Sequence, residues 1–170
     1  MRIAITGSPG VGKTTLCLRV FEALKRKVRI SGFVTREVRK RGSRIGFVLR
    51  NLANNEEIWL ARVGVGKVRV GKYVVFVEDF EKFLEGLDLN SELLIIDEVG
   101  PMELKSSKFS SLVLHLLKEN CNILATVHRT YRHRVIEEIK GNFKLFTINK
   151  DNRELLTGMI IRKLEEFYNV

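Results

Sequence analysis

The stretch "ITGSPGVGKTTL", residues 5–16, decides which fold we expect for this chain. It matches the spacing G-x-x-x-x-G-K-[ST], whose fixed positions are filled here by Gly7, Gly12, Lys13 and Thr14. A short apolar run of strand type, residues 2–6, comes before it, and apolar residues at helical spacing follow it. The sequence therefore predicts a loop that joins a strand to a helix.

Such a loop has the parts needed to hold a phosphate group. Glycines let successive backbone N–H groups turn toward an anion, and the start of the following helix adds partial positive charge at the same point. Lys13 would reach the β- and γ-phosphates of a nucleotide. The Thr14 hydroxyl would bind Mg²⁺, which prefers oxygen ligands and often takes only one or two of them from protein.

Length and composition indicate the kind of protein that this chain forms. Its 170 residues, 45% of them hydrophobic, suit a single domain over residues 1–170, and we expect a monomer. No apolar run approaches membrane-spanning length and the first apolar segment is too short for a signal peptide, so we expect a cytoplasmic protein without membrane contact. Cys17 and Cys121 have no metal-binding spacing and are expected to be buried thiols. The net charge of +10 implies an anionic partner: nucleotide, nucleic acid or lipid.

An antiparallel insertion is expected at approximately residues 30–62. Two alternating apolar runs are separated by the basic turn at 40–43, which is typical of a hairpin, and "EEIWLAR" at 56–62 predicts a third strand beside it. The glycine-rich stretch 63–73 lacks G-K-[ST] and a helical period, so it is interpreted as a turning loop.

Strands and helices alternate from Tyr73 onward. Each of four apolar strand-type runs is followed by a helical pattern, and these runs are residues 73–77, 92–98, 122–127 and 143–148. Asp151 and Glu154 resemble a capping box, which places the start of the last helix near residue 152. The alternation predicts an α/β fold of three layers, with a mainly parallel sheet covered by helices on both faces.

The segment "LLIIDEVGPMEL", residues 93–104, supplies candidate catalytic carboxylates. Asp97 ends a buried strand, at the sheet edge where it would hold Mg²⁺ opposite Thr14. Glu98 is the candidate catalytic base, because a second carboxylate there can orient water and accept its proton; the alternative is a solvated loop residue. Glu103 either supports this site or lies on the surface.

Further polar residues follow the strand at 122–127. Thr126 and His128 stand where one of them could touch the γ-phosphate or the attacking water. The arginines of the next segment are Arg129, Arg132 and Arg134. One of these could stabilise phosphoryl charge in a transition state, although a basic helix face is usually only solvated.

Several segments together resemble the THEP-type nucleoside-triphosphatase family of P-loop ATPases over nearly the full length. They are "GSPGVGKTT", "GFVTREVR", "GKYVVFVEDFE", "IDEVGPMEL" and "DNRELL", in this order. The resemblance implies a compact RecA-like domain that hydrolyses ATP, GTP and other nucleoside triphosphates with Mg²⁺ and little base preference. The nucleotide-binding residues it implies are Gly7, Ser8, Pro9, Gly10, Val11, Gly12, Lys13, Thr14, Thr15, Leu94, Ile95, Ile96, Asp97, Glu98, Val99, Gly100 and Pro101. Two departures are Asn149, in place of an expected threonine, and the more basic stretch "TVHRTYRHR".

The loop "INKDNRELL", residues 148–156, resembles the base-side loop of that family. Asn149 and Asn152 can donate and accept hydrogen bonds, and the Arg153 guanidinium can stack on purine or pyrimidine faces. Such a surface would bind many bases. The alternative makes Arg153 a first-turn residue of the last helix and nothing more.

Three other functions are alternatives to hydrolysis of nucleoside triphosphates by a stand-alone enzyme. A regulatory GTPase needs an aspartate three residues after the asparagine of N-K-x-D, and here that position is Asn152. A nucleoside or nucleotide kinase would use the same phosphate loop with an acceptor hydroxyl. A nucleic-acid-binding ATPase would use the basic hairpin for weak, sequence-independent contact, but few aromatic residues accompany those basic runs.

Overall fold

The computed structural model describes residues 1–170 and contains a single nine-stranded sheet. The strands are β1 (Arg2–Thr6), β2 (Ile30–Lys40), β3 (Ser43–Asn51), β4 (Glu57–Val63), β5 (Arg69–Val70), β6 (Tyr73–Val75), β7 (Leu93–Val99), β8 (Ile123–Val127) and β9 (Lys144–Thr147). The helices are α1 (Lys13–Leu24), α2 (Val77–Glu85), the 3-10 turn η1 (Glu103–Lys105), α3 (Ser107–Lys118), α4 (Arg134–Asn142) and α5 (Arg153–Tyr168). The strand order is β5-β6-β4-β3-β2-β7-β8-β1-β9.

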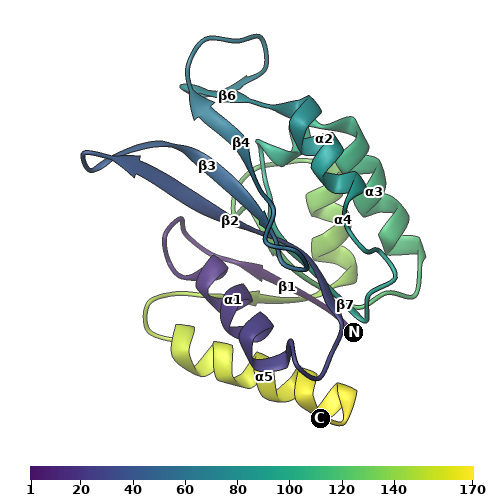
Figure 1. Cartoon of the computed structure of the whole chain (residues 1–170). Helices are drawn as coiled ribbons and strands as arrows, with labels where there is room; N and C mark the ends of the chain where they lie inside the picture. Colours follow the sequence, from purple (N-terminus) through teal and green to yellow (C-terminus); the bar gives the residue numbers. More distant parts are fainter.

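The half of the sheet from β2 to β9 is parallel and lies between two layers of helices. Strands β2, β7, β8, β1 and β9 pair in parallel with their neighbours. Helices α1 and α5 cover one face, and α2, α3 and α4 lie on the other (Figure 1). The predicted three-layer α/β fold with a mainly parallel sheet is therefore confirmed. None of the helices combines the length and the apolar character needed to cross a bilayer.

The other half of the sheet is antiparallel. The expected hairpin at 30–62 corresponds to β2, β3 and β4, and the antiparallel pairing continues through β6 to the edge strand β5. Strand β2 joins the two halves, because residues 30–33 pair in parallel with β7 while residues 33–40 pair with β3. The β2–β3 hairpin therefore projects from the edge of the helical layers (Figure 1).

Three local expectations differ from the structure. The stretch 63–73, expected as a loop, contains β5, and the run 73–77 does not begin the parallel alternation. It forms the short strand β6, which pairs antiparallel with β4, and α2 begins at Val77. An apolar run of this length fits either pairing, so periodicity alone could not decide its direction. Of the two cysteines, Cys17 is buried as expected, whereas Cys121 is half-buried.

An aromatic cluster fixes the helices of one face to β2. The Phe33 ring lies 6.0 Å from the rings of Phe80 and Phe83 and 6.3 Å from that of Phe109, measured between centroids. Edge-on and tilted contacts of this kind stabilise a core beyond the burial of their area. Because Phe33 lies where β2 pairs with both β7 and β3, the cluster anchors α2 and α3 at the junction of the two halves.

Gly32 is required where β2 crosses β7. Its φ of +114° is in the left-handed region, and a Cβ there would lie 1.9 Å from the carbonyl oxygen of Ile95. We predict that Gly32→Ala lowers the free energy of unfolding by about 3 kcal/mol or more, because backbone atoms must move to remove the overlap. Urea denaturation measures this loss.

Gly42→Ala is the matched control, since Gly42 has φ +79° but nothing within 4 Å of the Cβ position. It should cost about 1 kcal/mol, from backbone strain alone. Equal losses in the two variants would mean that the contact with Ile95 is not what requires glycine.

Candidate active site

Most of the predicted site residues meet at one edge of the parallel sheet, whereas Leu94, Ile95 and Ile96 are buried within β7. Strands β1, β7, β8 and β9 run in the same direction, so their carboxyl ends deliver the segments that follow them to the same edge. These segments are the phosphate loop at residues 7–14, the end of β7 with the turn after it at 97–101, the segment at 128–133 and the loop at 148–152. A crevice at this edge is where open α/β sheets bind ligands.

The phosphate loop is open toward an anion. Helix α1 begins at Lys13 with Gly12 as its N-cap, and neither a capping side chain nor an acidic residue occupies its first turn. The first N–H groups of the helix are therefore free to bind a phosphate. Lys13 folds over the loop, where its Nζ donates hydrogen bonds to the carbonyl oxygens of Gly7 at 2.8 Å and Ser8 at 3.2 Å.

Asp97 is a buried carboxylate held by three elements. Its Oδ2 accepts hydrogen bonds from the Thr14 hydroxyl of α1 at 2.7 Å and from the backbone N–H of Thr35 in β2 at 3.1 Å. Its Oδ1 accepts from the Thr126 hydroxyl of β8 at 2.7 Å. Burial raises the pKa of the Asp97 carboxyl, while these hydrogen bonds and the charge of Lys13 act in the opposite direction.

Besides Thr14, two threonines position Asp97. Thr126, expected as a candidate contact of the γ-phosphate or water, has its hydroxyl on Asp97 and is fully buried. Thr35 was not identified from the sequence, yet its hydroxyl also donates to the carbonyl oxygen of Asp97. Only the pairing of β2 with β7 brings Thr35 beside Asp97, and a single strand pattern does not reveal that register.

The oxygens of Thr14 and Asp97 fit a Mg²⁺ ion that is completed by substrate. They lie 2.7 Å apart, and Thr14 directly follows Lys13 of the phosphate loop. No group of three or more His, Cys, Asp or Glu side chains that could hold a metal is present. A hard cation with two protein oxygens takes its remaining ligands from phosphate and water, as Mg²⁺ commonly does.

Two glutamates flank Gly100 in the turn after β7. A Cβ built on Gly100 would lie 3.5 Å from Oε1 of Glu98 and 3.3 Å from Oε2 of Glu103, and the Gly100 N–H donates to Glu103 Oε2 at 3.1 Å. Burial raises the pKa of Glu98, and the charge of Lys13 opposes this. Glu103 is buried, so of its two sequence interpretations the structure supports that of a residue supporting the site.

The segment after β8 approaches the phosphate loop from the other side. His128 Nδ1 accepts hydrogen bonds from the backbone N–H groups of Tyr131 at 2.9 Å and Thr130 at 3.3 Å. Burial, with the charges of Lys13 and Lys140, lowers the pKa of His128. The three candidate arginines lie in different places. Arg129 reaches the phosphate loop, where its Nη1 donates to Ser8 Oγ at 3.0 Å. By contrast, two of them line a surface cavity made by Arg132, His133, Arg134 and Glu137.

The base-side loop is held by its own asparagines. Asn149 Oδ1 accepts from the N–H groups of Asp151 and Asn152, and the Asn152 side chain bonds to residues 147 and 149. Helix α5 starts as expected, but the predicted capping box is wrong: Asn152 is the N-cap position and no side chain caps it. Arg153 lies beside the phosphate loop, with its Cδ 3.7 Å from the Cβ position of Gly12.

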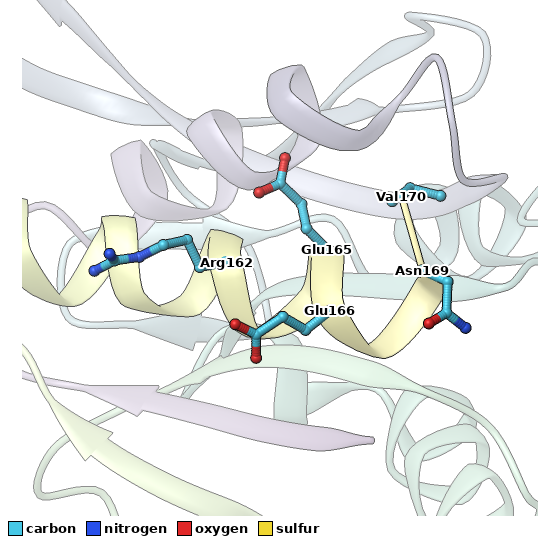
Figure 2. Close-up of a pocket in the computed structure, with 5 residues that line it drawn as sticks. All are labelled: Arg162, Glu165, Glu166, Asn169 and Val170. Atoms are coloured by element: carbon cyan, nitrogen blue, oxygen red, sulfur yellow. The ribbon is translucent and has the colours of Figure 1, made fainter.

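A second surface cavity lies at the end of α5. Its lining residues are Arg162, Glu165, Glu166, Asn169 and Val170. Figure 2 shows Glu165 and Glu166 pointing to different sides of the helix, and Arg162 pointing along it. Because these polar groups do not converge, this cavity has no binding geometry comparable to that of the sheet edge.

Because Glu103 is buried, we expect the stability of the protein to depend on pH through this residue. Burial and the neighbouring Glu98 raise its pKa well above the ordinary value of 4.5, so the folded state prefers the protonated form. Stability from this group is complete below pH 4.5 and is lost as the pH rises through the raised pKa. We predict that Glu103→Gln melts at least about 2 °C above the unchanged protein at pH 8, with little difference near pH 4.5. Calorimetry at both pH values measures this, and a less stable Glu103→Gln protein at pH 8 would contradict it.

Comparison with known proteins agrees with the geometry of the sheet edge. A family model described as NTPase matches residues 2–161. The chain is 51% identical over 165 residues to the nucleoside-triphosphatase THEP1 of Archaeoglobus fulgidus, covering 97% of this chain and 99% of that protein. It is 43% identical over 169 residues to the protein of the same name from Methanocaldococcus jannaschii, covering 96% and 97%.

Solved structures give the same assignment. The crystal structure of THEP1 from the hyperthermophile Aquifex aeolicus superposes with a TM-score of 0.80 at 32% identity, covering 97% of this chain and 99% of that one. The solution structure of a human cancer-related nucleoside triphosphatase also gives 0.80, at 34% identity, with 97% of each chain covered. The full-length agreement in sequence and fold shows that this chain belongs to the THEP1 family of P-loop nucleoside-triphosphatases.

Proposed function

We propose that this protein hydrolyses nucleoside triphosphates to diphosphate and phosphate, with Mg²⁺ as cofactor and low base specificity. Nucleoside-triphosphatase activity follows from family membership. The observation that carries the finer proposal is the convergence of Lys13, Thr14 and Asp97 at one sheet edge, with Glu98 directly after Asp97.

The phosphate loop binds and orients the triphosphate. The free N–H groups at the start of α1 and the Lys13 ammonium stabilise negative charge on the β- and γ-phosphates. Thr14 and Asp97 would hold Mg²⁺, which when bound neutralises charge on the phosphate oxygens. The donors from Thr35 and Thr126 orient the Asp97 carboxylate and favour its ionised form, against the effect of burial.

Glu98 prepares the attacking water. The water oxygen forms a bond to the γ-phosphorus while the bond from that phosphorus to the β–γ bridging oxygen breaks. The bonding electrons leave with the nucleoside diphosphate, and the Glu98 carboxylate accepts the proton of the water. Burial raises the pKa of Glu98, which makes it a stronger base toward that proton.

Ion pairs on the surface of the hairpin limit its attraction for nucleic acid. Arg36 pairs with Glu57 at 2.9 Å, while Arg39 at 3.2 Å and Arg44 at 2.6 Å both pair with Glu37. These pairs reduce the charge that the hairpin offers to a phosphate backbone. We therefore propose weak, salt-sensitive and sequence-independent contact with nucleic acid at most. A cytoplasmic location and a monomeric state stay predictions from the sequence.

Hydrolysis should depend on Lys13 and Glu98 in different ways. We predict that Lys13→Ala lowers both turnover and nucleotide affinity, because it removes the main positive charge from the phosphates. Glu98→Gln should retain binding of Mg²⁺–nucleotide but lower kcat by on the order of 10² to 10⁴. Asp97→Asn should instead weaken the dependence on Mg²⁺. Phosphate release and equilibrium binding of a nucleotide measure these effects.

The same assay separates hydrolysis from kinase activity. Phosphate release without any acceptor supports hydrolysis. If phosphorylated products form only when nucleosides are added, the protein is a kinase instead. Small, equal effects of Glu98→Gln and Asp97→Asn would remove Glu98 from the mechanism. Strong acceleration by RNA or DNA at physiological salt would favour a nucleic-acid-dependent enzyme.

Base tolerance is a separate prediction. Asn149 and Asn152 use polar atoms within their own loop, which leaves the Arg153 guanidinium as the exposed group beside the phosphate loop. Because stacking on a guanidinium does not discriminate between bases, kcat/KM for ATP, GTP and CTP should agree within roughly tenfold, a spread of about 1.4 kcal/mol. Arg153→Ala should raise KM for all three and change kcat less. A strong preference for one base that is lost on changing Asp151 would overturn this prediction.

A further inference from the structure

Two cationic side chains meet at Ser8 of the phosphate loop. Arg129 comes from the segment after β8, and its Nη1 donates to the Ser8 hydroxyl at 3.0 Å. Lys13 Nζ donates to the carbonyl oxygen of the same residue at 3.2 Å. Since Lys13 marks where the β- and γ-phosphates enter, the Arg129 guanidinium lies at the rim of the same phosphate site.

The backbone that carries Arg129 is fixed on both sides. The His128 N–H donates to the carbonyl oxygen of Val99 at 3.0 Å, which ties this segment to the end of β7, where Glu98 lies. The N–H groups of Thr130 and Tyr131 donate to the His128 ring, and the Tyr131 ring packs against the core. Arg129 is therefore presented by an ordered segment, although its own side chain is exposed.

Arg129 has no competing carboxylate. Other arginines of this chain form ion pairs, such as Arg19 with Glu154 at 2.7 Å and Arg36 with Glu57 at 2.9 Å, whereas Arg129 forms none. Its side-chain partner is the neutral Ser8 hydroxyl, which a phosphate oxygen can replace at little cost. The neighbouring Lys140 bonds only to the Arg129 carbonyl oxygen, at 3.4 Å, and leaves the guanidinium free.

We propose that Arg129 is a catalytic residue that donates hydrogen bonds from its guanidinium to the γ-phosphoryl oxygens in the transition state. This inference rests on the proposed hydrolysis. Arg129 forms and breaks no covalent bond and transfers no proton: the water proton goes to Glu98 and the diphosphate leaves with the electrons of the broken bond. The guanidinium spreads the charge that develops on the transferred group, which is the role of an arginine supplied within the chain.

The test compares Arg129→Ala with Arg129→Lys and with Arg132→Ala. Arg132 is the matched control, because it is an exposed arginine three residues away that lines the surface cavity beside α4 instead of the phosphate loop. Steady-state phosphate release gives kcat and KM for each variant. Binding of Mg²⁺–ADP, with and without aluminium fluoride as a mimic of the transferred phosphoryl group, separates transition-state from ground-state contacts.

We expect Arg129→Ala to lower kcat by on the order of 10³ while KM changes less than about threefold. Affinity for Mg²⁺–ADP with aluminium fluoride should fall by a similar factor, and affinity for Mg²⁺–ADP alone should be unchanged. Arg129→Lys should restore only part of kcat, because an ammonium lacks the two-pronged donor geometry. Arg132→Ala should retain kcat within about twofold.

Three results would overturn the proposal. These are a kcat of Arg129→Ala within threefold of the unchanged protein, an equal loss in Arg132→Ala, or an equal loss of affinity for Mg²⁺–ADP with and without aluminium fluoride. The last result would mean that Arg129 stabilises the phosphate loop itself and makes no contact that is specific to the transition state. Failure of the proposed function is distinguishable from all three, because the unchanged protein would then release no phosphate.

Discussion

The active-site edge depends on one buried carboxylate. Asp97 is 1% exposed, and burial alone would favour its neutral form. Hydrogen bonds from Thr14, Thr35 and Thr126 come from α1, β2 and β8, so three elements must be in register before the carboxylate is satisfied. An isolated buried charge is too costly to persist, which makes this arrangement a constraint on the fold as much as on the chemistry.

The parts of the fold that sequence could predict are those set by local pattern. The loop from Gly7 to Thr14, the buried strand that carries Asp97 and the alternation of strands with helices follow from spacing and periodicity within short windows, although β7 continues past Asp97 to Val99. The antiparallel direction of β6 could not be predicted, because a strand of three paired residues carries no signal for its direction. Capping by Asp151 also failed: the helix begins one residue later, with Asn152 at the N-cap position, and Asn149 accepts the N–H groups of Asp151 and Asn152.

Roles that depend on long-range register were not predictable. Thr35 and Thr126 are separated from Asp97 by 62 and 29 positions, and only strand pairing brings them to it. Arg129, Arg132 and Arg134 are equivalent in sequence terms, since each is a basic residue near the start of the same helix. The structure distinguishes them through Ser8, which only Arg129 contacts.

Strand β2 has a mechanical consequence for the enzyme. Residues 30–33 are clamped in the parallel sheet, residues 36–40 extend into the projecting hairpin, and Thr35 bonds to Asp97 between them. A hydrogen-bonded strand resists stretching, so a force on the hairpin tip would act along β2 on Thr35, whose backbone N–H donates to Asp97. The aromatic cluster of Phe33, Phe80 and Phe109 holds β2 against the helices two residues before Thr35.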